Sequence, residues 1–492
     1  SALSANTVGN RNVAVGFQSM GSGINVGQKN IAIGYKAGLP ITSGVRNVVI
    51  GDEAGLAMTT GGTNTIVGTE AGKAIVTTGD NTIVGNEAGK LNTTTLTAFG
   101  AFAGHDHVDG YSNTFIGRYA GREVTNGHSS TAVGNAALLT ATTAVTNTAI
   151  GCNSLRLTTT GADNTAVGFE SLDNNTTGYS NTALGGNALL HNTTGYSNTA
   201  IGRLSMGGGN PVTGSENTAV GRSSLAAITS GTQNVAMGFN ALTTATTFSY
   251  NTAIGWKALS DNRANENCAV GTNAMEKNTT GIRSSALGAY SLTTNTTGRD
   301  NVAVGYLASY ANTTGASNTA VGESALAANT TASNNVAVGK EALATNTAAS
   351  NNTAMGAFAL KVNLTGTANV AIGNDCMDSN TSGSKNTAVG TDALQANTTA
   401  DFNTAIGSDA LGLNLTGASN TAVGKNALES NTTASSGTAM GKDALGANTT
   451  GANNTAIGHD CMTSNTTGAN NTAVGGEALF TNTTGTQNVV VG

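Results

Sequence analysis

The sequence is poor in charged, aromatic, proline and cysteine residues. Charged residues make up 10% of the 492 residues and aromatic residues 4%, with 2 Pro and 1 Trp. The net charge of −6 offers no basic surface for nucleic acid or an anionic membrane. No apolar run approaches the roughly 18 residues of a membrane-spanning helix. We therefore expect no nucleic-acid partner and no insertion of this segment into a membrane.

The four cysteines are too few and too scattered for a disulfide framework: Cys152, Cys268, Cys376 and Cys461. Cys376 and Cys461 are five repeats of 17 residues apart, which at the spacing of stacked strands is roughly 24 Å. A disulfide cannot span that distance. We expect the cysteines to be small, buried, hydrophobic side chains.

Glycine is abundant, at 67 residues, and much of it recurs at a fixed interval. A five-residue phrase, such as Asn454-Thr455-Ala456-Ile457-Gly458, returns 29 times, and from Gly288 to Gly492 its glycines are 17 residues apart without a break. A short fixed period of this kind indicates a solenoid or another repeat array. The repeat outweighs the length-based expectation of about three globular domains.

The aligned copies give Asn-Thr-Ala-Val-Gly-x-x-Ala-Leu-x-x-Asn-Thr-Thr-Gly-x-x, numbered here as positions 1 to 17 of one coil. Seventeen residues are too few for a helical hairpin repeat, and frequent Gly and Asn disfavour helix. Short β-rich runs bounded by turn residues are typical of strands. The sequence therefore predicts an all-β, parallel β-solenoid of about 29 coils.

Strand alternation places positions 2 and 4 on one face and position 3 on the other. Position 4 varies among Val, Ile, Leu, Met and Phe, a mixture that suggests a packed interior, so we expect positions 2 and 4 inside the coil. The large residue of position 9, such as Leu155, Leu326 or Met377, is expected opposite them. Position 3 would then point outward.

Position 3 is apolar in all 29 copies, which an exposed strand position would not be. Such a stripe is best explained by burial against another copy of the chain. We therefore predict a self-association interface at position 3. Its representative residues are Ala32, Val49, Ile66, Phe115, Ala166, Ala253, Ala320, Ala388 and Ala456.

Asparagines at positions 1 and 12 are expected to form stacked amide ladders. Glycines at positions 5 and 15 are expected to permit the backbone conformations that turn the coil. The Asn-Thr-Thr phrases at Asn175, Asn312 and Asn448 also match the glycosylation acceptor pattern, but their place in a repeat favours a structural role.

The repeat is not uniform along the chain. Residues 1–121 have Gly at position 9, as at Gly55 and Gly121, whereas residues 122–492 usually have Leu there, and both parts belong to one continuous solenoid. The period changes to 18 residues before Gly34, 15 before Gly100, 19 before Gly221 and 16 before Gly271. The segment 206–211, at the longest interval, is expected to bulge out of the stack as a turn.

The phrases Asn12-Val13-Ala14-Val15-Gly16 and Asn301-Val302-Ala303-Val304-Gly305 resemble the head repeat of YadA-like trimeric autotransporter adhesins. The longer phrase that begins at Asn318-Thr319-Ala320-Val321-Gly322 resembles repeats in the tail-fibre shafts of phages and large viruses. The resemblance covers nearly the whole chain. It implies a left-handed β-roll, assembly as a homotrimer and attachment to a surface.

The chain also departs from those families. Its repeat is somewhat longer than that of the adhesins, and no coiled-coil stalk, membrane anchor, tip or chaperone domain is evident. No anchoring or receptor-binding residue can therefore be carried over. Because the repeat runs in phase to Gly492, we expect a segment of a longer fibre or one that stacks on a partner.

Chemical sites are sparse. His105, His107 and Asp109 form the best metal-like cluster, but solvated turn residues explain them better, and we expect no metal, cofactor or catalytic group. Aromatic residues near turns can contact sugars, although incidental surface positions explain them better. They are Tyr35, Tyr179, Tyr196, Phe248, Tyr250 and Trp256.

We therefore expect a non-enzymatic, extracellular fibre or adhesin, on a virion or a bacterial surface, that attaches to a receptor or glycan. The alternative is an ice-binding solenoid, because Thr-x-Val rows on a flat β face can match an ice lattice. That alternative requires positions 2 and 4 to point outward with a regular array of threonines. A bulky residue such as Phe99 or Met355 interrupts the regularity.

Overall fold

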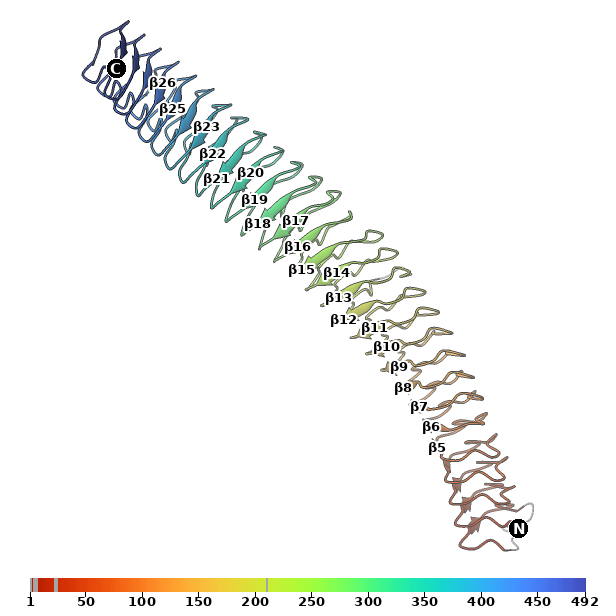
Figure 1. Ribbon diagram of the computed structural model, residues 1–492. Helices are drawn as coiled ribbons and strands as arrows, with labels where there is room; N and C mark the ends of the chain where they lie inside the picture. The colour runs from red at the N-terminus through yellow and green to blue at the C-terminus, as the bar shows by residue number, and fades with distance from the viewer. Residues whose placement is uncertain (1, 3–7, 22–24, 209–210) are drawn as a thin grey trace. The chain divides into compact units, whose positions relative to one another are not determined.

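The computed structural model describes residues 2, 8–21, 25–208 and 211–492, and it is an all-β, parallel β-solenoid with a 17-residue repeat. The chain comprises two compact units, Ser1–Tyr250 and Asn251–Gly492. Within each unit, one short strand per coil stacks beside the strand of the next coil (Figure 1). The predicted fold class is confirmed.

The first unit contains fourteen strands among its described residues. They are β1 (Val13–Val15), β2 (Ile31–Ile33), β3 (Val48–Ile50), β4 (Thr65–Val67), β5 (Thr82–Val84), β6 (Leu96–Phe99), β7 (Asn113–Ile116), β8 (Thr131–Val133), β9 (Thr148–Ile150), β10 (Thr165–Val167), β11 (Thr182–Leu184), β12 (Thr199–Ile201), β13 (Thr218–Val220) and β14 (Val235–Met237).

The second unit contains fifteen strands. They are β15 (Thr252–Ile254), β16 (Cys268–Val270), β17 (Ser285–Leu287), β18 (Val302–Val304), β19 (Thr319–Val321), β20 (Val336–Val338), β21 (Thr353–Met355), β22 (Val370–Ile372), β23 (Thr387–Val389), β24 (Thr404–Ile406), β25 (Thr421–Val423), β26 (Thr438–Met440), β27 (Thr455–Ile457), β28 (Thr472–Val474) and β29 (Val489–Val491).

Strand pairing keeps one register where the period changes. In the 15-residue coil Thr82 pairs with Thr97, in the 19-residue coil Thr199 pairs with Thr218, and in the 16-residue coil Thr252 pairs with Cys268. The turns therefore absorb these insertions and deletions, and within each unit position 2 lies beside position 2 of the next coil. The predicted bulge at 206–211 lies partly outside the described residues, because it includes 209 and 210.

The faces of the strand are the reverse of those predicted from the sequence. Position 3 is buried in every strand except β1 and β29, where it is half-buried, while positions 2 and 4 are exposed or half-buried throughout. The nine residues expected at a self-association interface are 0% exposed within a single chain: Ala32, Val49, Ile66, Phe115, Ala166, Ala253, Ala320, Ala388 and Ala456. Position 3 therefore forms the interior of the coil, and its side chains cannot face a second copy.

The physical reason is the narrowness of the coil. Its interior holds position 3 from the strand and positions 8 and 9 from the opposite side, as with Ala320, Ala325 and Leu326, all 0% exposed. The predicted burial of position 9 is confirmed. Once a leucine fills this space, only alanine fits across from it, so a uniformly small residue marks close packing. The varied shapes at position 4 reflect the absence of a packing partner within the chain.

Coils with Gly at position 9 confirm this size relation. In most of them the space is filled from position 3, by Val49, Ile66, Ile83 or Phe115. Where position 3 is alanine as well, Ile41 fills the space beside Gly38, and Leu96 and the Phe115 ring fill it beside Gly104. A Cβ atom on Gly72 would lie 3.2 Å from Cδ1 of Ile66, and one on Gly121 would lie 2.6 Å from the Phe115 ring. The compositional difference between residues 1–121 and 122–492 therefore reflects which position, 3 or 9, provides the large side chain of the coil interior. The division of the chain into two compact units, in contrast, falls between Tyr250 and Asn251.

The glycine of position 5 is required by two constraints. Gly458, for example, has φ +140°, and a Cβ atom there would lie 2.3 Å from the carbonyl oxygen of Gly475 in the next coil. At position 15, Gly161 has no positive φ in the left-handed region. A Cβ atom there would nevertheless lie 2.3 Å from the carbonyl oxygen of Gly178, so the close contact alone applies. The expected backbone conformation is therefore confirmed for position 5. At position 15 the glycine is explained by the close approach of the neighbouring coil.

Both predicted asparagine ladders are present. At position 1, the amide nitrogen and Nδ2 of Asn47 both donate to Oδ1 of Asn30, each at 3.0 Å, and Nδ2 also donates to the Gly61 carbonyl. At position 12, Nδ2 of Asn192 donates to Oδ1 of Asn175 at 2.7 Å. These amides are buried, so each ladder bond satisfies a polar group that water cannot reach.

We predict that the core tolerates a volume exchange in the second unit. Ala320→Ile should destabilise the chain by about 1–3 kcal/mol through overpacking, and Leu326→Gly should destabilise it by removing a buried side chain. The double variant reproduces the arrangement of Ile66 and Gly72. Its loss of stability should be smaller than the sum of the single losses by about 1 kcal/mol or more, measured by chemical denaturation.

The matched control is Thr331→Ser, because position 14 of the same coil is exposed and lies away from both the core and the strand face. This variant should change the free energy of unfolding by less than about 0.5 kcal/mol. Strict additivity of Ala320→Ile and Leu326→Gly would contradict the proposed exchange of volume.

Candidate functional site

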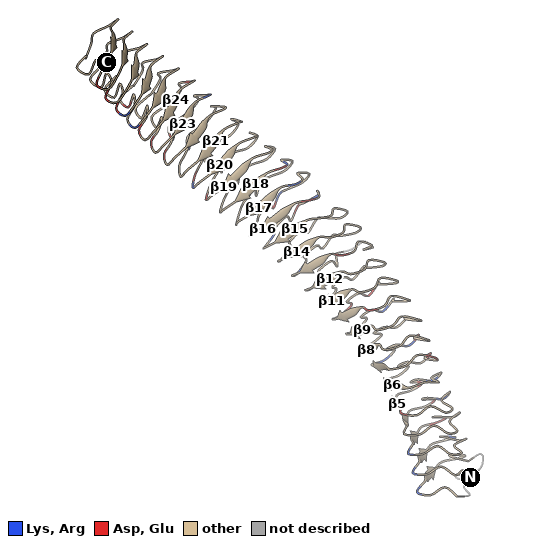
Figure 2. Ribbon diagram, viewed as in Figure 1, with Lys and Arg blue, Asp and Glu red and all other residues tan. Residues whose placement is uncertain are grey.

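The strand face formed by positions 2 and 4 is the most extended candidate surface. Position 4 is apolar in all 29 strands, and examples such as Leu184, Met237 and Ile254 are exposed. No strand contains a charged residue, and Figure 2 shows the Lys, Arg, Asp and Glu residues in the turns. Within each unit the face is therefore an uncharged row of threonine or valine beside a row of larger aliphatic side chains.

Threonine dominates position 2, in two uninterrupted runs. Ten successive strands of the first unit, β4 to β13, have Thr there, and so do six of the second unit, β23 to β28. Sequence reasoning assigned these side chains to the interior. The signal that could have corrected it is the size relation between positions 3 and 9, which is visible in the sequence.

His107 takes part in the asparagine ladder instead of forming a metal site. It occupies position 12, is fully buried, and its Nδ1 lies 2.8 Å from Oδ1 of Asn92 while its Nε2 lies 2.9 Å from Nδ2 of Asn113. These contacts require a neutral ring with Nδ1 protonated. Burial lowers the pKa of His107 to about 4, partly opposed by the charge of Asp109. The prediction of a solvated turn residue was wrong for this histidine.

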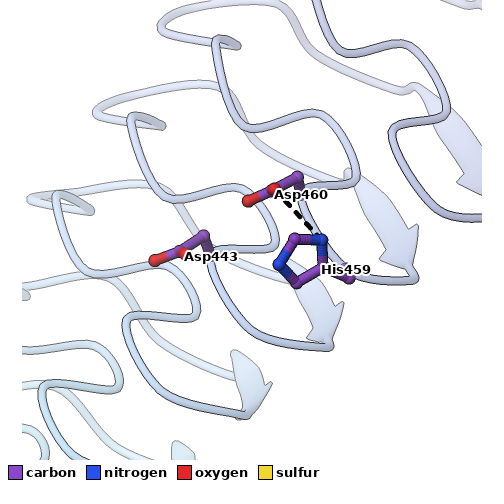
Figure 3. Close-up of side chains that lie close together, drawn as sticks. All are labelled: Asp443, His459 and Asp460. Atoms are coloured by element: carbon purple, nitrogen blue, oxygen red, sulfur yellow. Dashed lines mark ion pairs between the residues drawn. The ribbon is translucent and has the colours of Figure 1, made fainter.

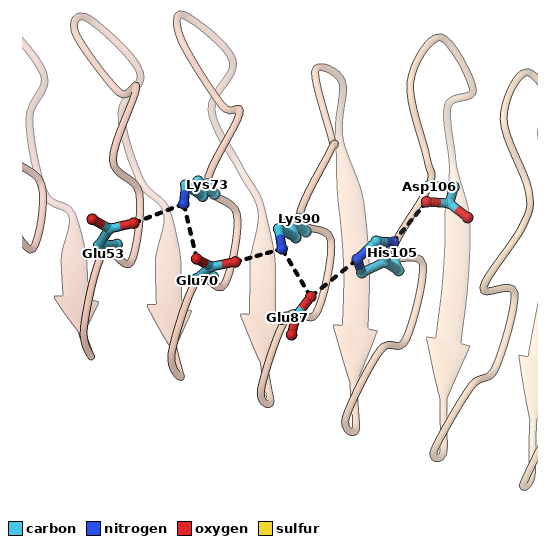
Figure 4. Close-up of polar contacts among 7 residues, drawn as sticks. All are labelled: Glu53, Glu70, Lys73, Glu87, Lys90, His105 and Asp106. Carbon is cyan, nitrogen blue, oxygen red and sulfur yellow. Dashed lines mark hydrogen bonds and ion pairs between the residues drawn. The ribbon is translucent and has the colours of Figure 1, made fainter.

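His105 lies at the end of a chain of ion pairs on the turns of the first unit (Figure 4). Glu70 forms ion pairs with Lys73 (Nζ–Oε1 2.9 Å) and Lys90 (Nζ–Oε2 2.5 Å). Lys90 also forms an ion pair with Glu87 (Nζ–Oε2 2.9 Å). Nε2 of His105 lies 3.2 Å from Oε2 of Glu87. Hydrogen bonds from Lys90 and Lys73 lower the pKa of Glu70 to about 2. His105 and His107 thus belong to two different hydrogen-bond systems, and Asp109 acts on His107 through its charge.

A second cluster, Asp443, His459 and Asp460, has the spacing of metal ligands, with its ligand atoms within 4.8 Å of one another (Figure 3). Nδ1 of His459 lies 3.0 Å from Oδ2 of Asp460. Asp443 is already paired with Lys442 at 2.5 Å and accepts a hydrogen bond from Asn426 at 2.7 Å. That ammonium competes with any cation, so the geometry is that of a surface ion-pair cluster.

The cysteine prediction is half correct. Cys376 and Cys461 are buried and unpaired, whereas Cys152 and Cys268 are exposed. Cys268 occupies position 2, so its exposure follows from the reversed faces, whereas Cys152 occupies position 6, in the turn after β9. The asparagines of the Asn-Thr-Thr phrases, Asn175, Asn312 and Asn448, are buried in the ladder, which confirms their structural role.

Aromatic side chains stack between neighbouring coils on the turn surface. The rings of Tyr179 and Tyr196 are 4.9 Å apart and 2° from parallel, and those of Tyr111 and His128 are 4.6 Å apart and 6° from parallel. Both pairs occupy position 16. Tyr179 and Tyr196 were expected near turns, but the sequence analysis did not single out Tyr111 or His128, nor the alignment of the two pairs in one column.

The first unit also has a surface hollow of about 370 Å³, lined by Leu157, Asn174, His191, Thr193 and Pro211. It lies where the 19-residue coil departs from the regular repeat. Nδ2 of Asn174 lies 3.0 Å from Nδ1 of His191. Among the described residues that line it, His191 is the one titratable side chain.

A comparison with protein-family models and with curated protein sequences finds no match to this chain. Across the described residues, the structure has no helix long and apolar enough to cross a membrane.

We predict that His107 makes the stability of the first unit depend on pH. Because the folded-state pKa of about 4 lies below the ordinary histidine pKa of 6.5, the unfolded chain binds the proton more readily. The stabilisation by neutral His107 is complete above about pH 6.5 and is lost as pH falls toward 4. The free energy of unfolding can fall by at most about 3 kcal/mol through this group.

The matched variant is His107→Asn, which restores the usual ladder residue without a titrating group. The free energy of unfolding of both proteins should be measured between pH 7 and pH 4. The carboxylates are the same in the two proteins, so their contributions cancel in the difference. The wild type should lose more stability than the variant over this interval. Parallel stability profiles would show that His107 does not carry the effect.

Proposed function

We propose that the chain is a non-enzymatic structural segment of an extracellular fibre, on a virion or a bacterial surface, that mediates attachment and assembles with copies of itself. The observation that supports this proposal is the uncharged strand face of positions 2 and 4. A long row of exposed aliphatic side chains on a repeat protein is typical of an interaction surface. A repeating strand face suits a second copy of the same chain, because each coil of one copy can then contact an equivalent coil of the other.

The size of the strand face is adequate for a stable interface. Two side chains from each of the 14 strands of the first unit give 28 residues. A standard interface takes about 20–30 residues from each partner. Aliphatic side chains without charges also match the centre of an obligate interface. The second unit presents the same two positions on 15 further strands.

We propose a closed homotrimer, in which three strand faces meet around one axis. Cyclic closure covers every face equally, whereas an open arrangement leaves one face unpaired. The resemblance to trimeric fibre repeats supports the number three. The interface now consists of positions 2 and 4, with Leu184, Met237 and Ile254 as representatives, in place of position 3.

We predict a mass near three times 48.4 kDa by light scattering in native buffer. Ile150→Glu combined with Leu184→Glu places charges on the strand face, where burial against a second copy would be costly. The double variant should shift toward the mass of one chain with its β circular dichroism unchanged.

The control is Thr160→Glu with Thr177→Glu, two exposed residues at position 14. These changes add the same charge away from the strand face and should leave the mass unaltered. A monodisperse wild-type monomer of 48.4 kDa would refute self-association.

Ice binding is the second candidate, and the outward threonine runs favour it. Position 2 of β4 to β13 presents a row of hydroxyl and methyl groups at about 4.8 Å per coil, with position 4 about 6.6 Å away across the strand. The requirement that these positions point outward is met. The fibre proposal ranks first because position 4 includes Phe99, Leu184 and Met237, which make the surface uneven.

Thermal hysteresis separates the two candidates. The fibre proposal predicts a freezing point equal to the melting point at micromolar concentrations of protein. A gap between them that disappears in Thr148→Tyr with Thr165→Tyr would establish ice binding and replace the fibre proposal. Thr160→Tyr at position 14 is the matched control.

A further inference from the structure

The aromatic column at position 16 of the first unit has an unusual arrangement. Two stacked pairs, Tyr111 with His128 and Tyr179 with Tyr196, are separated by two coils whose position-16 residues are Val145 and Ala162. Tyr111, Tyr179 and Tyr196 are exposed, and His128, Val145 and Ala162 are half-buried. The column therefore has a short apolar floor between two aromatic stacks.

The ring faces at the ends of the two stacks are directed toward each other. Because each pair stacks in parallel from coil to coil, the uncovered face of His128 looks along the column toward Val145, and that of Tyr179 looks toward Ala162. The two rings are three coils apart, about 14 Å at the spacing of parallel strands. After the thickness of the rings is subtracted, the interval accommodates one or two hexose rings.

Polar groups line both sides of this interval. The position-14 residues Thr143 and Thr160 are exposed on one side, and the position-17 residues Thr146 and Asp163 are exposed on the other. The Thr146 hydroxyl donates a hydrogen bond to Oδ1 of Asp163, which holds the carboxylate in place. Asp163 therefore offers Oδ2 as a fixed acceptor beside the apolar floor.

We propose that this interval, bounded by His128 and Tyr179, binds a neutral carbohydrate. The C–H face of a hexose packs on an aromatic ring, while its hydroxyl groups need acceptors and donors at the rim. The carboxylate of Asp163 disfavours anionic ligands such as nucleotides or sialylated glycans. The proposal rests on the attachment function and assigns it a ligand class and residues.

Isothermal titration of the full-length protein tests the proposal with three probes. They are a β-1,4-linked glucose hexamer, a β-1,4-linked N-acetylglucosamine hexamer, and sialyllactose as the anionic comparison. At least one neutral hexamer should bind at micromolar to millimolar concentration, more tightly than sialyllactose. No binding of either hexamer to the wild type at millimolar concentration overturns the proposal.

The variants separate the site from the fold. Tyr179→Ala should weaken binding about tenfold, the equivalent of one lost ring contact, whereas Tyr179→Phe should retain it. Ala162→Arg fills the floor without removing a ring and should abolish binding. Tyr250→Ala, at an exposed tyrosine of position 17, should bind as the wild type does.

Unchanged affinity in both Tyr179→Ala and Ala162→Arg would place any sugar binding elsewhere and refute the assignment. Thermal unfolding of each variant identifies a loss caused by misfolding, and Tyr179→Phe gives an independent measurement with the stack intact. Light scattering on the same samples reports self-association. A wild-type protein that self-associates but binds neither hexamer would reject this site alone, whereas a monomeric wild-type protein that binds sugar would reject the fibre assembly alone.

Discussion

The fixed width of the coil interior is the constraint on which the rest of the structure depends. A large side chain at position 9, as in Leu326, or at position 3, as in Phe115, requires alanine or glycine at the other of these two positions. Where both are small, as with Ala32 and Gly38, Ile41 of position 12 fills the space. Since neighbouring coils are joined by ladders of buried asparagines, an oversized residue in one coil disturbs its neighbours as well.

Much of the fold could be predicted because periodicity carries the information. The 17-residue interval and the turn residues predict a parallel β-solenoid, and the repeated Asn-Thr-Thr phrases predict the second ladder. These features depend only on contacts between equivalent positions of adjacent coils. Such contacts are as regular as the sequence itself, so one sequence suffices to recognise them.

The assignment of the strand faces failed for a physical reason. An alternating strand has two faces, and both are apolar here, so hydrophobicity alone cannot distinguish the interior from the surface. The deciding information is steric: position 3 is large in Val49, Ile66 and Phe115, where position 9 is glycine. The candidate surfaces failed similarly, because the alignment of Tyr179 with Tyr196 depends on which turn positions coincide between coils. The role of His107 became clear only from its two buried hydrogen bonds.

The register of the strands has a consequence for how a gene of this type can change in length. Insertions and deletions are confined to turns, and within each unit every strand meets its neighbour in the same way. Unequal recombination between two copies of the coding sequence, at any pair of Asn-Thr-Ala phrases, removes or adds whole coils. The product retains matched ladders and an aligned strand face wherever core sizes agree at the junction. Length can therefore vary between related genes in steps of one coil, without a new folding problem at each step.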